Sequence, residues 1–351
     1  MPITFMKIFD DRAENTRGKV GGLYALLIGA NFAAWAWAIT SFHGRPVLLG
    51  TALLAYSFGL RHAFDADHIA AIDNVTRKLM QEGKRPVSAG FFFSLGHSTV
   101  VAAMTVAIAA TAAALESRFA SLKDLGGMIG TGVSATFLFA IAIANTFVLV
   151  AVWRNFRKVR RGERPNGCDL DTALGNRGLT AHIFSRLFRF IGRSWQLYPI
   201  GLLFGLGFDT ATEVGLLGIS AAEAARGMSL WSILVFPALF AAAMSFADTT
   251  DGVVMLGAYG WAFVKPIRKL YYNLTITFVS VAVALVVGGL EALGLLADKL
   301  NLQGALWDAV GAIDENFGML GYGIVAVFVA SWAVSAAIYR LKRYDEIEAS
   351  V

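Results

Sequence analysis

The chain has 351 residues, of which 56% are hydrophobic and only 16% are charged, and its formal net charge is +5. Soluble domains average about 25% charged residues, so this composition excludes an ordinary soluble protein and predicts an integral membrane protein. The single cysteine, Cys168, excludes an internal disulfide or a thiolate cluster. Because the positive charge lies in the loops, we expect a lipid bilayer as partner and no nucleic acid; the oligomeric state is left open.

Apolar runs long enough to cross a bilayer follow one another along the chain. They predict an all-α fold with eight transmembrane helices, at Val20–Phe42, Val47–Ile72, Val87–Leu115, Met128–Trp153, Leu197–Ile219, Trp231–Val264, Asn273–Leu296 and Met319–Leu341. The first run is too long for the core of a signal peptide, so we expect it to remain in the mature protein. Residues 73–86, between the second and third runs, are expected to form a basic loop.

Basic residues set the expected orientation. If both termini are cytoplasmic, 24 of the 30 lysines and arginines lie on the inner side, which satisfies the positive-inside rule. We therefore expect a multi-pass protein of the cell (inner) membrane. Its expected segments are an N-terminal segment (1–19), a first membrane half (20–153), a basic cytoplasmic loop with an amphipathic helix at Thr180–Trp195 (154–196), a second membrane half (197–341) and a cytoplasmic tail (342–351).

Two features suggest a transporter. The sixth run would be about 50 Å long as one helix, well beyond a 30 Å hydrocarbon core. It contains Asp248 and Asp251 beside Gly252 and Gly257, so we expect a broken helix there. The second half also repeats short polar patterns of the first. The segment 64–68 resembles 208–213 and the segment 94–100 resembles 245–251, which suggests an internal two-fold repeat around a central site.

The most unusual stretch is Arg61-His62-Ala63-Phe64-Asp65-Ala66-Asp67-His68, where five of eight residues are ionisable inside an apolar run. Each such residue costs roughly 2.5–3.5 kcal/mol at membrane depth, so together they indicate a function. Imidazole and carboxylate suit divalent nickel, cobalt or zinc. In a regular helix Asp67 points away from Asp65 and His68, so either the helix is locally unwound or Asp67 serves a neighbouring helix or orients a ligand histidine.

Further polar side chains lie in other apolar runs. His97, with Ser94 three residues before it, is a candidate ligand in the third run; the alternative is a packing histidine. Asp209, Thr212 and Glu213 share one helix face in the fifth run. Arg61 is the expected counter-ion of the carboxylates, most simply of Asp65. One arginine leaves most of these acids uncompensated, which favours occupancy by cations.

These residues also carry a resemblance. His62, four residues, then Asp67-His68 is similar to the His-x4-Asp-His signature of the nickel–cobalt transporter family, which are eight-span secondary permeases. Three more segments resemble motifs of that family in spans three, five and six, namely Phe91–Val101, Leu206–Glu213 and Met244–Gly252. The resemblance implies a metal-recognition role for His62, Asp67, His68 and His97, and extends it to Asp209, Glu213 and Asp248.

The resulting prediction is a permease for uptake of Ni²⁺ and/or Co²⁺, with the metal as transported substrate, no cofactor and no enzymatic activity. The alternatives are a metal efflux permease and an intramembrane zinc hydrolase, although the sequence has no His-Glu-x-x-His motif. A membrane potential of about 100 mV, negative inside, favours entry of a divalent ion by roughly 4.6 kcal/mol. Uptake therefore needs no further coupling, although proton coupling of uptake stays an alternative, whereas export would require proton exchange.

Overall fold

The computed structural model describes residues 5–12, 14–111, 116–160, 191–206, 211–262, 266–314 and 316–341. Within these ranges the regular elements are helices and there is no strand, which confirms the predicted all-α class. The elements are α1 (Phe5–Ile8), α2 (Thr16–Ser41), α3 (Pro46–His62), α4 (Ala66–Gln81), α5 (Ala89–Thr111), α6 (Glu116–Arg160), η1 (Ser194–Gln196), α9 (Leu197–Phe204), α10 (Ala211–Ala225), α11 (Leu230–Ile233), α12 (Val235–Ala262), α13 (Pro266–Leu300), α14 (Ala305–Asp314) and α15 (Phe317–Leu341).

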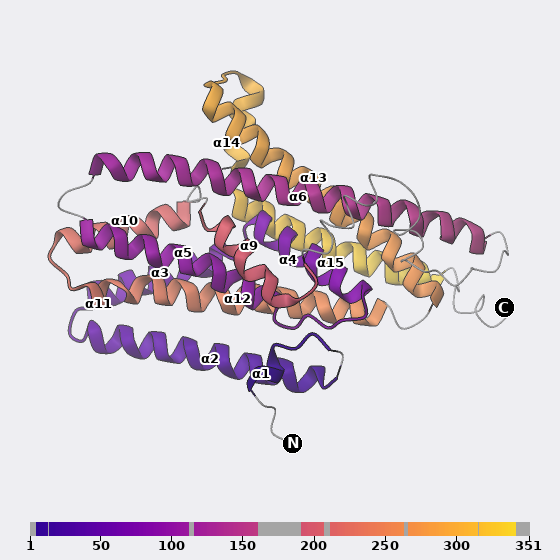
Figure 1. Cartoon of the computed structure of the whole chain (residues 1–351), viewed down its shortest axis with the longest axis horizontal. Coiled ribbons are helices and arrows are strands. Elements are labelled where there is room, and N and C mark those ends of the chain that lie inside the picture. Colours follow the sequence, from indigo (N-terminus) through magenta and orange to yellow (C-terminus); the bar gives the residue numbers. More distant parts are fainter. Residues whose placement is uncertain are drawn as a thin grey trace.

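Most of the long helices run along one common direction, and α14 stands apart from the bundle at the top of the view (Figure 1). Within the described residues, five helical stretches are long and apolar enough to cross a bilayer, and the bent pair α3–α4 makes a sixth. The bundle is therefore that of a multi-pass membrane protein. Most of the predicted amphipathic helix, and the tail after Leu341, lie outside the described residues.

Polar and apolar side chains are distributed as a lipid environment requires. Large apolar side chains lie on the outside of the bundle: Phe32 and Trp231 are each 74% exposed, and Phe278 is 61% exposed. Three histidines and several aspartates and hydroxyl side chains are buried among the helices instead. In water such an arrangement would expose a large apolar area, whereas lipid tails accept it.

The second predicted span is broken within its polar stretch. Helix α3 ends at His62, α4 begins at Ala66, and the two axes are bent by 51°. Asp65, between them, has extended backbone geometry and stands at the N-cap position of α4. Of the two arrangements that the sequence left open for this stretch, the structure has the local interruption.

The prediction of a basic loop at residues 73–86 is wrong for its first part. Helix α4 continues to Gln81, and its residues from Ile69 to Arg77 are buried. Asp73 and Arg77 are spaced by four residues, so opposite charges lie on one face of the helix and each has buried polar partners. In the sequence these charges indicate a loop, but the hydrogen bonds to buried partners make it possible for both side chains to lie inside the bundle.

The prediction of a broken helix in the middle of the sixth run is also wrong. Helix α12 is continuous from Val235 to Ala262, and the only interruption of the run among the described residues is at Leu234, between α11 and α12. Asp248 does not interrupt the helix because its carboxylate meets a histidine of α4 and leaves the backbone hydrogen bonds intact.

Helices α5 and α12 pack against each other, while α6 and α15 pack on α13. α3 and α4 pack on α12, whereas α9 and α10 pack on α5. Glycines permit very close contacts: a Cβ atom added at Gly90 would lie 2.1 Å from the carbonyl oxygen of Asp248, and one added at Gly59 would lie 2.2 Å from that of Phe240. The polar residues of several helices are thereby brought to one place.

Candidate metal centre

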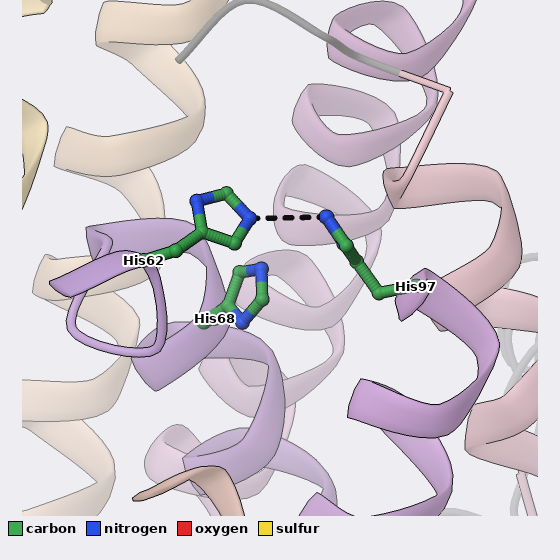
Figure 2. A group of neighbouring side chains, drawn as sticks. All are labelled: His62, His68 and His97. Atoms are coloured by element: carbon green, nitrogen blue, oxygen red, sulfur yellow. Dashed lines mark hydrogen bonds between the residues drawn. The ribbon is translucent and has the colours of Figure 1, made fainter. Parts of the chain in front are cut away.

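Three histidines from three helices meet in the middle of the bundle. His62 ends α3, His68 lies in the first turn of α4, and His97 lies within α5. Their side chains turn toward a common point (Figure 2), and one ligand nitrogen from each lies within 4.8 Å of the others. At most 2% of any of the three residues is exposed. We call His62, His68 and His97 the histidine triad.

The spacing of these nitrogens suits a shared ion. The Nε2 atoms of His62 and His97 lie 3.0 Å apart (Figure 2). Metal–nitrogen bonds of about 2.0–2.1 Å allow two ligand nitrogens on one ion to be at most about 4.2 Å apart. A limit of 4.8 Å across the triad exceeds that by about 0.6 Å, so small ring movements are enough for three nitrogens to bind one divalent ion.

The break between α3 and α4 makes the triad possible. On a continuous helix, His62 and His68 would be six residues apart and would point to different sides. The interruption at residues 63–65 lets one histidine end a helix while the other begins the next. Their ring centroids are 4.7 Å apart as a result.

Two carboxylates face the Nδ1 atoms of the triad. Asp65 Oδ2 lies 2.7 Å from His62 Nδ1, and the two oxygens of Asp248 lie 3.3 and 3.4 Å from His68 Nδ1. An imidazole held by a carboxylate at Nδ1 presents Nε2 for binding, which is the usual arrangement around metal-bound histidines. The Nε2 atom of His68 has no hydrogen-bond partner. Asp65 and Asp248 therefore orient ligands in this geometry.

Glu213 on α10 is placed differently. Its Oε1 atom lies 2.7 Å from Nε2 of His97 and 3.8 Å from Nε2 of His62. It thus faces the nitrogens that point into the triad, and is a candidate for a fourth ligand. Thr212, beside it, has its hydroxyl 3.3 Å from His62 Nδ1. Helix α10 adds an oxygen donor to three nitrogen donors.

Several buried polar atoms of this centre and of residues near it in the sequence have no hydrogen-bond partner. Apart from Asp65 Oδ2, which is in ionic contact with His62, nine such side-chain atoms occur in the described residues, and six belong to Asp65, His68, His97, Ser98, Thr249 and Asp251. Native proteins leave few buried polar groups without a hydrogen bond, so their concentration here indicates space for a polar or charged ligand.

Other residues expected at the site lie outside the triad. Asp67 is half-buried, and its Oδ1 accepts a hydrogen bond from the backbone N–H of His68, a common role for a carboxylate in the first turn of a helix. Arg61 has no direct ion pair with a carboxylate in the described ranges, but its positive charge acts on Asp65, so its role as counter-ion of Asp65 stays a prediction. Ser94 donates to Ser245. Asp209 lies outside the described residues.

Comparison with known proteins gives the family. The family model described as "NicO: High-affinity nickel-transport protein" matches residues 48–338. The chain belongs to this family. It is 60% identical over 332 residues to the "High-affinity nickel transport protein" of Cupriavidus necator, covering 95% of both chains. It is 44% identical over 339 residues to the "Nickel transporter NicT" of Mycobacterium tuberculosis, covering 93% of this chain and 90% of that protein.

A member named for another metal is also similar. The "Cobalt transport protein NhlF" of Rhodococcus rhodochrous is 42% identical over 308 residues, covering 86% of this chain and 87% of that protein. No solved structure matches the chain. The family comprises transporters and not enzymes, so the alternative of an intramembrane zinc hydrolase is wrong. The metal is the substrate of this family and not a cofactor.

Proposed function

We propose that this chain is a permease that carries Ni²⁺ and/or Co²⁺ into the cell across the cytoplasmic membrane. The observation that carries the proposal is the histidine triad, which brings three buried imidazoles together inside a membrane bundle. Family membership supports the same substrate, since relatives named for nickel and for cobalt are both similar to the chain. Uptake is the direction that the membrane potential favours for a divalent cation.

In this proposal His62, His68, His97 and Glu213 bind the ion, while Asp65 and Asp248 orient the histidines. Three nitrogens and one carboxylate form a donor set that nickel, cobalt and zinc all accept, so selectivity depends on ligand placement. Asp67 supports the start of α4, where it fixes His68 through the backbone. Asp251 is a further acidic residue of this proposal, and Asp209 enters it from the family resemblance of its motif alone.

We also propose eight spans with both termini cytoplasmic and two repeated halves. The contacts support the repeat: Ser94 donates to Ser245 at 3.0 Å, and these residues occupy matching positions in the two repeated segments. Helix α4 contacts α12 through His68 and Asp248. In the second half, α10 contacts α5 in a corresponding way, through Glu213 and His97. The first half thus supplies nitrogen donors where the second supplies carboxylates.

Metal-resolved uptake tests the function. Cells that express the chain should accumulate nickel or cobalt above cells with an empty vector, when nickel, cobalt and zinc compete at low concentration. His68→Ala should abolish this accumulation at unchanged protein level, because a ligand nitrogen is lost. The matched control is His43→Ala, since His43 is exposed on the turn after α2 and should be dispensable. Wild-type uptake by His68→Ala would refute the proposed site, and metal depletion of the cells would favour efflux.

A further inference from the structure

A second cluster of buried polar side chains lies on α4 beyond the histidine triad. It includes Asp73, Asn74 and Arg77 of α4, together with residues of three other helices: Asn145 of α6, Tyr259 of α12, and Thr277 and Ser280 of α13. At most 2% of any of these residues is exposed. We call these seven residues the α4 polar cluster. None of them contacts the triad through a hydrogen bond in the described part of the chain.

Asp73 ties α4 to two other helices. Its Oδ1 accepts a hydrogen bond from the hydroxyl of Tyr259, and its Oδ2 accepts one from the hydroxyl of Ser280 at 2.7 Å. Both partners are neutral, so the carboxylate has hydrogen bonds but no cation directly against it. Removing either hydroxyl would weaken the link between α4 and a neighbouring helix without changing any charge.

Arg77 binds other partners. Its Nη1 donates to Thr277 at 2.8 Å and its Nη2 donates to Asn74 at 3.2 Å. Asn74 in turn accepts a hydrogen bond from Asn145 at 2.6 Å. The Nε atom of Arg77 has no hydrogen-bond partner, and the guanidinium makes no direct ion pair with Asp73 among the described residues.

The same side chains have a second possible arrangement. Asp73 and Arg77 are four residues apart on one helix, a spacing at which a carboxylate and a guanidinium pair readily. In the observed arrangement both charges bind other helices, whereas direct pairing would satisfy them within α4 and release α12 and α13. Desolvation offsets much of the Coulombic gain of a buried ion pair, so direct pairing has no large advantage over the observed hydrogen bonds. The cluster therefore has the properties of a two-state element.

The α4 polar cluster lies between the histidine triad and one end of the bundle. Helix α4 starts beside the triad and ends at Gln81, and the loop after it reaches the N-terminal segment, where the N–H of Arg85 donates to the carbonyl of Asp11. Helix α12 runs along α4 over this length, with Asp248 at the triad and Tyr259 at the cluster. The seam of α4, α12 and α13 thus lies between the triad and the end of the bundle that carries the N-terminus.

We propose that the α4 polar cluster is the gate on the N-terminal side of the metal centre. The gate is closed when Asp73 is bonded to Tyr259 and Ser280, and it opens when Asp73 pairs with Arg77 and the seam separates. The inference rests on the proposed transport function, and with cytoplasmic termini this gate is the inner one. Its test needs no nickel, so the two proposals fail separately.

Thiol labelling measures the opening. Thr76 lies between Asp73 and Arg77 on α4, is fully buried, and has a hydroxyl without a hydrogen-bond partner. Thr76→Cys in a Cys168→Ser background therefore places one thiol in the seam at little structural cost. A membrane-impermeant cationic methanethiosulfonate is added to vesicles from the side that carries the N-terminus, and the rate of labelling is followed without metal.

Removing the hydroxyls that hold the closed state should raise the labelling rate. Ser280→Ala should raise it about fivefold, and Ser280→Ala with Tyr259→Phe should raise it further, since each buried hydrogen bond contributes about that factor. Ser220→Ala is the matched control: Ser220 is also buried, but its hydroxyl donates only to Leu216 of its own helix. That variant should label at the unmodified rate.

Unchanged labelling in folded Ser280→Ala would overturn the gate and leave the cluster a structural feature. An equal increase in Ser220→Ala would also overturn it, because general loosening would explain both. If the double variant does not fold, Ser280→Ala alone decides. Nickel binding by the purified protein is measured in parallel and should be unchanged in the cluster variants. Absence of nickel binding in the unmodified protein would refute the proposed function, while the labelling rates would still test the gate.

Discussion

A carboxylate lies beside the Nδ1 atoms of His62 and His68, whereas none lies beside the Nδ1 atom of His97 in the described residues. Its Nε2 faces both Glu213 and His62, and its Nδ1 has no hydrogen-bond partner. It is also the only member of the triad on an uninterrupted helix, and no neighbouring carboxylate fixes its ring from behind. Among the three histidines, His97 is thus the one whose distance from the ion changes when a single helix shifts.

We predict that His97 controls which metal is moved more than whether any is moved. His97→Gln keeps a side-chain amide able to bond Glu213 but removes the imidazole, so the ligand geometry changes while the buried carboxylate keeps a partner. The ratio of nickel to cobalt uptake should change several-fold, because the two ions bind the same donors and differ in preferred geometry. Uptake of each metal by cells expressing the variant gives this ratio.

A fall of both rates by the same factor would contradict this role. His97 would then be an equal ligand or a packing residue. His97→Ala provides a second comparison, since it also removes the partner of Glu213 and should lower uptake of both metals more strongly than His97→Gln does.

For single residues, the sequence predicts which side chains belong to the metal centre better than it predicts the role of each. The scarcity of histidine in apolar runs was enough to identify His62, His68 and His97 as candidates. Adjacent positions in a motif do not reveal which way each side chain points, so the sequence leaves the role of Asp67 open. The structure adds that its Oδ1 accepts a hydrogen bond from the N–H of His68. Asp65 also has a neighbour that the sequence does not predict, because a carboxylate three residues after a histidine meets it across the helix break.

The elements around the site depend on close approach of backbones. The added Cβ at Gly90 would lie 2.1 Å from the Asp248 carbonyl oxygen, far inside any van der Waals contact. Gly90 therefore sets the distance between α5 and α12 next to the orienting carboxylate of His68.

We predict that Gly90→Ala separates α5 from α12 and lowers both stability and nickel uptake. Forcing a methyl group into a packed contact costs typically 1–3 kcal/mol. Gly29→Ala is the matched control: Gly29 lies within α2, and an added Cβ there meets nothing within 4 Å. It should be neutral or slightly stabilising, because alanine is favoured over glycine in helices by about 1 kcal/mol. Thermal unfolding in detergent and nickel uptake are the measurements; equal stability of the two variants would refute the argument.

The segment before α2 is joined to the segment around η1 by a buried carboxylate. Both the backbone N–H and the hydroxyl of Ser194 donate to Asp11. Burial raises the pKa of Asp11 above its usual range, although the hydrogen bonds from Ser194 and the charge of Lys84 oppose this shift. The folded protein therefore holds a proton on Asp11 more tightly than the unfolded chain does.

A raised pKa in the folded state determines the sign of the pH dependence. The contribution of Asp11 to stability is greatest below the pKa of the unfolded chain and is lost as the pH rises through the folded pKa. Asp11→Asn keeps an acceptor for Ser194 without the ionisation, so the wild type should gain stability relative to this variant as the pH falls from about 7 to about 4.5. Melting temperatures across this range test the sign, and a relative loss on acidification would contradict it. Asp11→Ala should be less stable than either, because Ser194 loses its acceptor.

Helices were easier to predict than their ends. The apolar runs predict the bundle, but the charges of Asp73 and Arg77 favour a loop, although their four-residue spacing also fits one face of a helix. The carboxylates of α12 were likewise expected to break the helix. In both cases a polar partner comes from a distant part of the chain: Tyr259 contacts Asp73, and His68 contacts Asp248. These partners offset the cost of burying a carboxylate in a helix, which the local sequence alone suggests is high. Such partners are set by tertiary packing and are not visible in a single segment.

For the whole molecule, transport of a divalent ion without further coupling should follow the membrane potential. Two charges gain about 4.6 kcal/mol per 100 mV, so roughly 30 mV corresponds to a tenfold change in the equilibrium ratio of nickel across the membrane. Proteoliposomes with potassium gradients and valinomycin should reproduce this slope. A ratio that instead follows an imposed pH gradient at zero potential would contradict it and show proton coupling.

The break between α3 and α4 also has a consequence for biosynthesis. The segment that carries Arg61 and both histidines has five ionisable residues in eight positions, and at roughly 2.5–3.5 kcal/mol each it is a poor substrate for insertion into lipid by itself. The groups that stabilise its polar part, Asp248 on α12 and Glu213 on α10, are synthesised more than a hundred residues later. The second span therefore depends on the second half of the chain to become stable in the bilayer, and a chain truncated before α10 should leave this segment exposed to quality control.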